Sequence, residues 1–404
     1  MTTNNYPNAK CFISNVLNSS TFSNLKQTRR KFIICLLMCY LSIKGKINFL
    51  QLSRFSEYCE QYFRIDFENR FNFQKFNFEL ISMQKIKACI IAFDPSYIPK
   101  SGKSTFGTGY FWSGCAKKTK WGMDICGFAA VDILRNTAFH LNAIQTPYLE
   151  NTTLIDYYCQ IVKENYMYFK ELSVYLVADA YFSKKKVVDT IVSLGLHFIG
   201  RLRDDASMKY IYKGEYSGRG APKKYDGKVN PHSLDMKHFH KALDQEDIKI
   251  YSAIVYYGAF ERNINLAVAV FNKNGKEIAR KLYFSTDLKL DAVKIVRYYR
   301  SRFQIEFLYR DAKQYCALNS SQARSENKLD MHFNAALTAV NLAKCEHLAC
   351  GDNSKKPFSM SDYKTMYHNE LLMTIFFRRL GMNPDSKKNK QIINELKRYG
   401  TIAA

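Results

Sequence analysis

Four side chains near residue 300 could together hold a nucleic-acid backbone beside a metal ion. They are Tyr299, Arg302, Glu306 and Lys313, in the segment 291–315. On an α-helix, at about 100° per residue, all four would share one narrow face. A carboxylate can bind a divalent metal, two cations can hold phosphates, and a phenol can donate a hydrogen bond or stack on a base. The spacing therefore predicts a helix that meets a nucleic-acid backbone at a metal site.

A simpler explanation is an exposed salt-bridge stripe. Arg302 and Glu306 are four residues apart, which is the spacing of a stabilising ion pair on a helix surface. The helix alone does not separate the two explanations, so the rest of the chain has to decide.

Charge favours the nucleic-acid interpretation. The 404 residues carry a formal net charge of +24 and are 47% hydrophobic. This length predicts two to four modules with packed cores, and so large a positive charge is typical of a polyanion partner. The eleven cysteines include no CxxC pair, which indicates reduced thiols in a cytoplasmic protein. The most apolar run, residues 32–43, is too short to span a bilayer, so we expect no membrane segment.

The chain divides into five stretches by pattern. Residues 1–85 are predicted to be helical, with a loose polar arm up to about residue 22. A glycine turn at Gly45 between helices is compatible with a helix-turn-helix DNA reader, and equally with a plain helical bundle. Residues 204–286 are predicted to be rich in β-strands, with a hairpin turn in NKNGKE at 272–277. The last stretch, 346–404, is predicted to be a helical, basic tail.

The remaining two stretches, 86–203 and 287–345, should form an α/β core. The first has three strands, a helix, a strand, a helix and a strand. In order, these are expected at 87–94, 108–114, 123–132, 152–169, 174–179, 183–195 and 196–202.

Two acids end apolar strands of this core. Asp94 closes the run IIAFD and Asp179 closes YLVAD. Strand ends in open α/β sheets are where ligands gather, and Glu306 would bring a third carboxylate from the helix. Three carboxylates can hold two Mg²⁺ ions and leave positions open for phosphate and water. A single acid at a strand end is more often only a solubilising cap, so neither aspartate alone decides the matter.

These motifs resemble those of the DDE transposases of bacterial insertion sequences. The Tyr-Arg-Glu-Lys spacing is similar to the signature of the insertion-sequence-four family. Asp94 in FDPSYIPKSGK and Asp179 in VADAYFSKKKVVD are similar to its two aspartate motifs. The resemblance covers about 86–345 and is weaker over 24–85, where the family carries a helical DNA-binding region.

The resemblance implies a ribonuclease H-like catalytic core with a β-rich insertion and a helical N-terminal DNA-binding region. It implies two Mg²⁺ or Mn²⁺ ions on Asp94, Asp179 and Glu306. Tyr299, Arg302 and Lys313 would hold DNA phosphates. The partners would be transposon terminal inverted repeats and target DNA, bound by a homodimer in the bacterial cytoplasm, at the nucleoid. The implied activity is cleavage at the element's ends followed by strand transfer. The alternatives are a nuclease of this fold without strand transfer, and a non-catalytic DNA-binding protein derived from a transposase.

Overall fold

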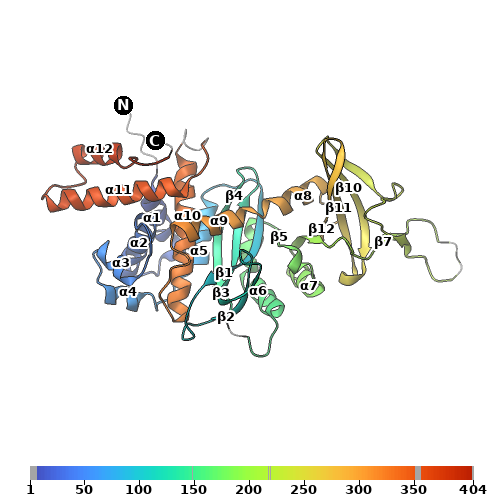
Figure 1. The fold of residues 1–404 in the computed structure, drawn as a ribbon, viewed down its shortest axis with the longest axis horizontal. Coiled ribbons are helices and arrows are strands. Elements are labelled where there is room, and N and C mark those ends of the chain that lie inside the picture. The colour runs from blue at the N-terminus through green and yellow to red at the C-terminus, as the bar shows by residue number, and fades with distance from the viewer. Residues whose placement is uncertain (1–6, 148, 217, 219, 351–355, 403–404) are drawn as a thin grey trace.

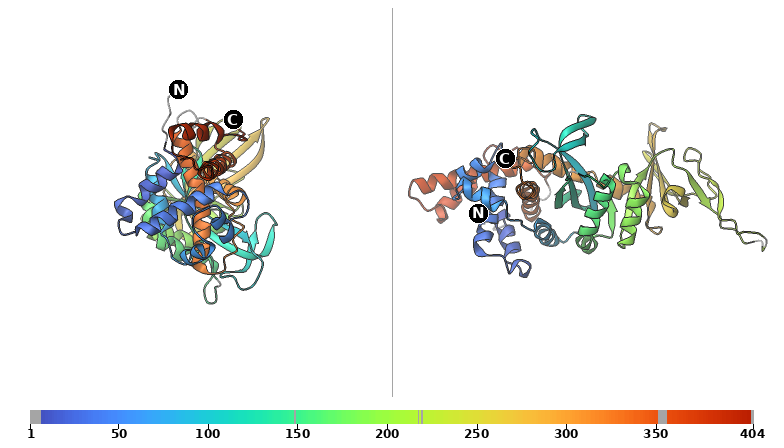
Figure 2. Two further views of the ribbon diagram at one scale, coloured as in Figure 1. Left: turned by 90° about the vertical axis from the view of Figure 1, so that its left-hand side faces the viewer. Right: turned by 90° about the horizontal axis from the view of Figure 1, so that it is seen from below.

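The chain forms an elongated molecule with helices at one end and β-strands at the other (Figure 1). The computed structural model describes residues 7–147, 149–216, 218, 220–350 and 356–402. The first and last helices lie together at the helical end, and the core sheet separates them from the β-rich end (Figure 2). None of the helices in these described ranges is long and apolar enough to cross a membrane.

The helices fall into three groups along the chain. The N-terminal group is α1 Ala9–Leu17, α2 Gln27–Ser42, α3 Phe49–Arg54, α4 Glu60–Asp66 and α5 Phe73–Ser82. Helices α6 Leu154–Leu172 and α7 Lys185–Ser193 belong to the core. The C-terminal group is α8 Ala292–Ser301, α9 Gln304–Tyr315, α10 Glu326–Ala349, α11 Met360–Arg379 and α12 Lys387–Leu396. Short 3-10 turns stand at Ser20–Phe22, Ala180–Phe182 and Gly258–Phe260.

Within the described residues, the strands form one twelve-stranded sheet. In the core they are β1 Cys89–Pro99, β2 Gly109–Ser113, β3 Lys118–Asp132, β4 Thr137–Gln145, β5 Tyr175–Val177 and β6 His197–Leu202. The insertion adds β7 Met208–Ile211, β8 Tyr225–Lys228, β9 His240–Asp244, β10 Ile248–Tyr257, β11 Arg262–Lys273 and β12 Lys276–Ser285.

The core of the sheet has an antiparallel half and a parallel half. Strand β3 pairs antiparallel with β1 and β4, whereas β1, β5 and β6 run parallel in that order. The β5–β6 connection carries α7, as a parallel crossover requires. The result is a mixed α/β fold with a large, mostly antiparallel sheet, consistent with a ribonuclease H-like transposase core.

The expectation of three strands before the first core helix is wrong, because β4 is a fourth. Its sequence, TAFHLNAIQ, lacks a clear strand pattern, because the polar residue His140 occupies a buried position. Helix α10 satisfies that backbone: the Asn341 side chain bonds both the N–H and the C=O of His140, each at 2.7 Å. Three residues further along β4, the Asn334 side chain likewise bonds both the N–H and the C=O of Ala143, at 3.0 Å each. The helix thus covers an open sheet edge through amide side chains.

The expectation of a loose polar arm up to residue 22 is also wrong for the described part of that stretch. Helix α1 is capped by Asn8 and buries Phe12, Ile13, Val16 and Leu17. The Ala9 N–H donates to Glu346 of α10 at 2.9 Å. The Asn- and Ser-rich composition concealed this apolar stripe. Residues 1–6 of the expected arm lie outside the described residues.

The N-terminal helices share one hydrophobic core with α10 and α11. Phe32 and Tyr40 of α2 are fully buried. The Tyr40 hydroxyl forms a hydrogen bond with the His332 ring of α10 at 2.6 Å. The Tyr40 backbone carbonyl accepts from the Lys364 ammonium of α11 at 2.5 Å. The helical end is therefore a bundle built from both ends of the chain (Figure 1). Helix α10 also runs through the expected boundary between residues 345 and 346.

The β-rich insertion continues the core sheet. Strand β12 pairs antiparallel with β6, and β11 and β10 follow it outward. The predicted hairpin at 272–277 is confirmed, because Asn274 and Gly275 form the turn between β11 and β12 with φ of 52° and 75°. Positive φ at both turn residues suits an Asn-Gly pair.

Candidate active site

The two predicted aspartates lie on neighbouring parallel strands. Ala92 of β1 is in register with Val177 of β5. Asp94 and Asp179 each follow two residues later, so the alternation of side chains along a strand places them on the same face. The expectation that Asp94 ends its strand is wrong, because β1 runs on to Pro99. The chain does turn at Asp179, whose carboxylate accepts from the Tyr181 N–H at 3.0 Å.

The helix that carries Glu306 is broken, and the prediction of one continuous helix over 291–315 is wrong. Helix α8 ends at Ser301 and α9 begins at Gln304. At this junction the backbone N–H groups of Phe303, Ile305 and Glu306 each donate to the carbonyl three residues earlier. Such bonds are typical of a tightened 3-10 turn. Neither glycine nor proline causes the break. Instead, α8 packs on β6 and the insertion strands, while α9 packs across β1, β3 and β4.

Arg302 stands in this break and connects two of the predicted acids. Its guanidinium lies 3.0 Å from Asp94 and 3.2 Å from Glu306. The side chain is 12% exposed, against 19% for Asp94 and 39% for Glu306. The Arg302–Glu306 pair is therefore not part of an exposed salt-bridge stripe. Arg302 also donates to Asp94 of β1, which lies 208 positions earlier in the sequence.

The environment of Asp94 and Glu306 favours the neutral forms of these two carboxylates. Burial is the largest influence on Asp94 and, with the charges of Asp179 and Glu306 opposing that of Arg302, raises its pKa to about 7. Burial also raises the pKa of Glu306, against the lowering effect of Arg302. Since Asp179 acts on both, the three acids feel one another's charge. Excess negative charge in a partly buried site is what a bound cation would relieve.

The residues fit a divalent metal by their chemistry. Carboxylate oxygens are the ligands that Mg²⁺ and Mn²⁺ prefer. Across the described ranges, however, no three acidic, histidine or cysteine side chains stand close enough to hold one ion as placed. Arg302 occupies the space between Asp94 and Glu306, and its buried Nε has no hydrogen-bond partner in the described part of the chain. An ion shared by these two carboxylates would require the guanidinium to turn away.

Lys313 and Tyr299 lie on either side of this centre. Lys313 donates to the Ser96 hydroxyl at 2.8 Å and to the Tyr97 carbonyl at 3.0 Å, both on β1 just beyond Asp94. Burial lowers the pKa of its ammonium group. Tyr299 packs against Tyr283, with ring centroids 4.9 Å apart, and the Arg302 guanidinium lies 5.9 Å from its ring. Two of the three ammonium donors of Lys313 are thus used, which leaves one for a ligand.

Sequence reasoning missed a buried support beneath Asp94. The Tyr309 hydroxyl, one turn after Glu306, donates to the Asp94 backbone carbonyl at 2.7 Å. Gly127 of β3 is the register partner of Asp94, and a Cβ there would lie 1.9 Å from the Tyr309 hydroxyl oxygen. Glycine is therefore required for α9 to approach the strand. A glycine inside an apolar strand run is the one signal that could have predicted this contact.

Asp124 of β3 was also missed. It is buried, accepts from Thr146 at 2.8 Å and Tyr158 at 3.1 Å, and burial raises its pKa to about 6. Because two side-chain donors already hold it, we assign it a structural role.

This geometry agrees with the comparison to known families. Residues 89–342, more than half of the chain, match the model of the transposase DDE domain. The chain therefore belongs to the transposase DDE-domain family. The matched segment runs from the first residue of β1 into α10, and so includes both aspartates, the broken helix and the insertion. No curated protein matches the chain.

Proposed function

We propose that this transposase cleaves DNA at the ends of an insertion sequence and transfers the freed strand into target DNA. Asp94, Asp179 and Glu306 would hold two Mg²⁺ or Mn²⁺ ions. The observation that carries the proposal is that Arg302 bridges Asp94 of β1 and Glu306 of α9, while the charge of Asp179, which follows β5, acts to raise the pKa of both. Two such ions supply a nucleophile at neutral pH and stabilise charge on the attacking and leaving oxygens.

The protein's own groups would position the substrate. Arg302 is the cation between Asp94 and Glu306, so its guanidinium could exchange these carboxylate partners for a phosphate oxygen when metal is bound. Lys313 keeps one donor free beside β1. Tyr309 and Gly127 fix the backbone that presents Asp94. These contacts orient the scissile phosphate and do no bond chemistry.

The finer assignments are also proposals. The Tyr-Arg-Glu-Lys pattern supports membership of the insertion-sequence-four group. The charge of +24 supports duplex DNA as partner, with the helices of residues 1–85 contributing to its binding. A homodimer on DNA follows from the resemblance alone.

A plasmid assay separates this proposal from its two rivals. The plasmid would carry the reading frame's own flanking DNA on both sides of a marker, and the purified chain would be added with Mg²⁺, with Mn²⁺ or with chelator. We expect metal-dependent double-strand ends at imperfect inverted repeats, and joined products on sequencing.

Cleavage without joined products would favour the nuclease. Retarded but uncut DNA at every metal concentration would favour the non-catalytic protein. Either result would overturn the proposal.

A further inference from the structure

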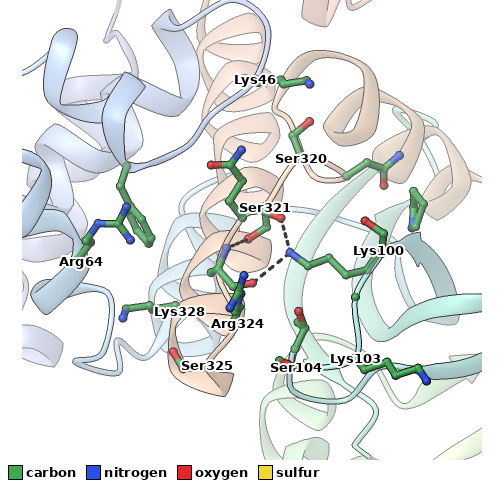
Figure 3. Close-up of a pocket in the computed structure, with 18 residues that line it drawn as sticks. Lys46, Arg64, Lys100, Lys103, Ser104, Ser320, Ser321, Arg324, Ser325 and Lys328 are labelled. Carbon is green, nitrogen blue, oxygen red and sulfur yellow. Dashed lines mark hydrogen bonds between the residues drawn. The ribbon is translucent and has the colours of Figure 1, made fainter.

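A hollow in the described part of the molecule lies outside the carboxylate site. It has a volume of about 940 Å³ and is lined by three segments that are distant in sequence. They are the α2–α4 region, the chain after β1, and the residues between α9 and α10. Figure 3 shows side chains from all three pointing into one space. We call it the basic groove.

Six cations line the basic groove, and no carboxylate is among its described lining residues. They are Lys46, Arg64, Lys100, Lys103, Arg324 and Lys328. Arg64 and Lys328 pair with Glu60 and Glu68 from outside the groove. Lys46, Lys103 and Arg324 are exposed and make no ion pair with any described residue. Such a cluster creates a positive potential that favours an anionic ligand.

The floor of the groove is fixed rather than loose. The Lys100 ammonium donates to the carbonyls of Ser321 and Ala323, at 2.6 and 3.1 Å, and burial lowers its pKa. The Phe106 N–H donates to the Arg324 carbonyl at 2.9 Å. These bonds tie the segment after α9 to the segment after β1. The hydroxyls of Ser320 and Ser321 lie at this seam, as Figure 3 shows. Hydroxyls among lysines and arginines are the usual partners of a DNA phosphate backbone.

The basic groove and the carboxylate site are connected by strand β1. Strand β1 leads from Asp94, past the Lys313 contacts at Ser96 and Tyr97, to Lys100. Six residues of extended strand span roughly 20 Å at about 3.3 Å each. Duplex DNA advances about 3.4 Å per base pair, so a duplex lying along β1 would reach the groove about six base pairs from the site.

We propose that the basic groove binds the phosphate backbone of the duplex about six base pairs from the cleavage position. The inference rests on the proposed function for the position of the cut, although not for the binding itself. Lys46, Lys103 and Arg324 would make the direct phosphate contacts. Because Lys46 comes from the helical end and Lys103 from the core, bound DNA would bridge the two.

The test measures DNA affinity against salt for two matched triple variants. One is Lys46→Ala with Lys103→Ala and Arg324→Ala. The other removes the same charge from α12, as Lys387→Ala with Lys388→Ala and Lys390→Ala. Fluorescence anisotropy would use duplexes from the flanking DNA. We expect the groove variant to lower the slope of log K against log salt by about 2 to 3, since each lost phosphate contact removes about 0.9. The α12 variant should change it by less than about 1.

A length series locates the contact. For the unmodified chain, affinity should rise when the duplex extends beyond about six base pairs from the cut, and the groove variant should lose that step. Equal slopes in both triple variants, or a step that survives in the groove variant, would overturn the proposal. So would competition by inorganic triphosphate that is as strong as competition by duplex, because the groove would then be a small-anion site.

The two proposals fail separately. The groove variant should still cut a duplex too short to reach the groove. If no duplex is cut by any form while the salt slope and length step persist, the proposed chemistry fails and the groove assignment stands.

Discussion

The carboxylate site and the basic groove use charge in opposite ways. The site has three acids and one arginine, partly buried, with the pKa of Asp94 moved to about 7. The groove has six cations, of which Lys46, Lys103 and Arg324 are exposed to solvent. Low solvent exposure strengthens each electrostatic interaction in the carboxylate site, whereas solvent and salt weaken the interactions of the basic groove. Cleavage should therefore depend strongly on each single residue of the carboxylate site. DNA affinity should fall gradually with the number of groove cations that are removed.

The largest effect should come from removing one carboxylate. We expect Asp94→Asn, Asp179→Asn and Glu306→Gln each to lower the cleavage rate by at least about 10³-fold, because the carboxylates that would hold the two metal ions act as a unit. DNA affinity should stay within a few-fold, since the groove and the rest of the basic surface are intact. Single-turnover cleavage and anisotropy measure the two. Asp385→Asn, an exposed acid near α12, is the control.

Retention of near-normal cleavage by any of the three variants would remove that residue from the site. Parallel losses of cleavage and of DNA affinity would instead make it a structural residue.

Lys313→Ala should have the next largest effect. We expect cleavage to fall by about 10²-fold through loss of a positioned cation. Mn²⁺ affinity, measured by calorimetry, should be retained, because Lys313 contacts β1 beyond Asp94 and not its carboxylate. Loss of Mn²⁺ binding would show that Lys313 holds the strand rather than the phosphate.

Gly127→Ala tests the buried support of the site. The new Cβ cannot share space with the Tyr309 hydroxyl, so we expect a loss of about 1–3 kcal/mol in the free energy of unfolding. Adding Tyr309→Phe removes the clashing oxygen and should recover part of that stability, but not the cleavage rate. Denaturant unfolding measures the first and the cleavage assay the second. Gly114→Ala, which meets nothing within 4 Å, is the matched control.

An effect of similar size should appear in the pH dependence of stability. An aspartate has a pKa of about 3.9 when unfolded, and Asp94 has one of about 7 when folded. The folded chain therefore binds this proton more tightly, and stability should fall as pH rises from about 4 to 7. Without metal, Asp94→Asn should escape this loss and be more stable than the unmodified chain at pH 8, by on the order of 1–3 kcal/mol. Thermal unfolding in chelator at pH 5 and pH 8 measures it, and no difference between the two pH values would contradict the burial of Asp94.

The two regions also differ in how far sequence could predict them. The position of Asp179 just after β5 was predictable, because an acid that follows a short apolar run is visible along the chain. Asp94 was expected to end its strand, but β1 continues to Pro99. The turn at Asn274 and Gly275 was predictable for a similar local reason. The break at Arg302 was not, because it arises where α8 and α9 pack on different strands.

Structure that depends on distant partners stayed hidden. Strand β4 has polar residues whose backbone is satisfied by Asn334 and Asn341, about 200 positions later. The basic groove joins residues near 46, 100 and 324, whose cations look like ordinary surface charge in the sequence.

The central claim is that Asp94, Asp179 and Glu306 bind two divalent ions at a DNA end. Anomalous diffraction from crystals of the chain with a terminal duplex and Mn²⁺ tests it most directly. We predict two Mn²⁺ peaks, about 3.5–4 Å apart, among the three carboxylates, with Arg302 turned from Asp94 toward a phosphate. A structure with DNA bound, no Mn²⁺ peak at these residues and Arg302 still bridging Asp94 and Glu306 would contradict the account.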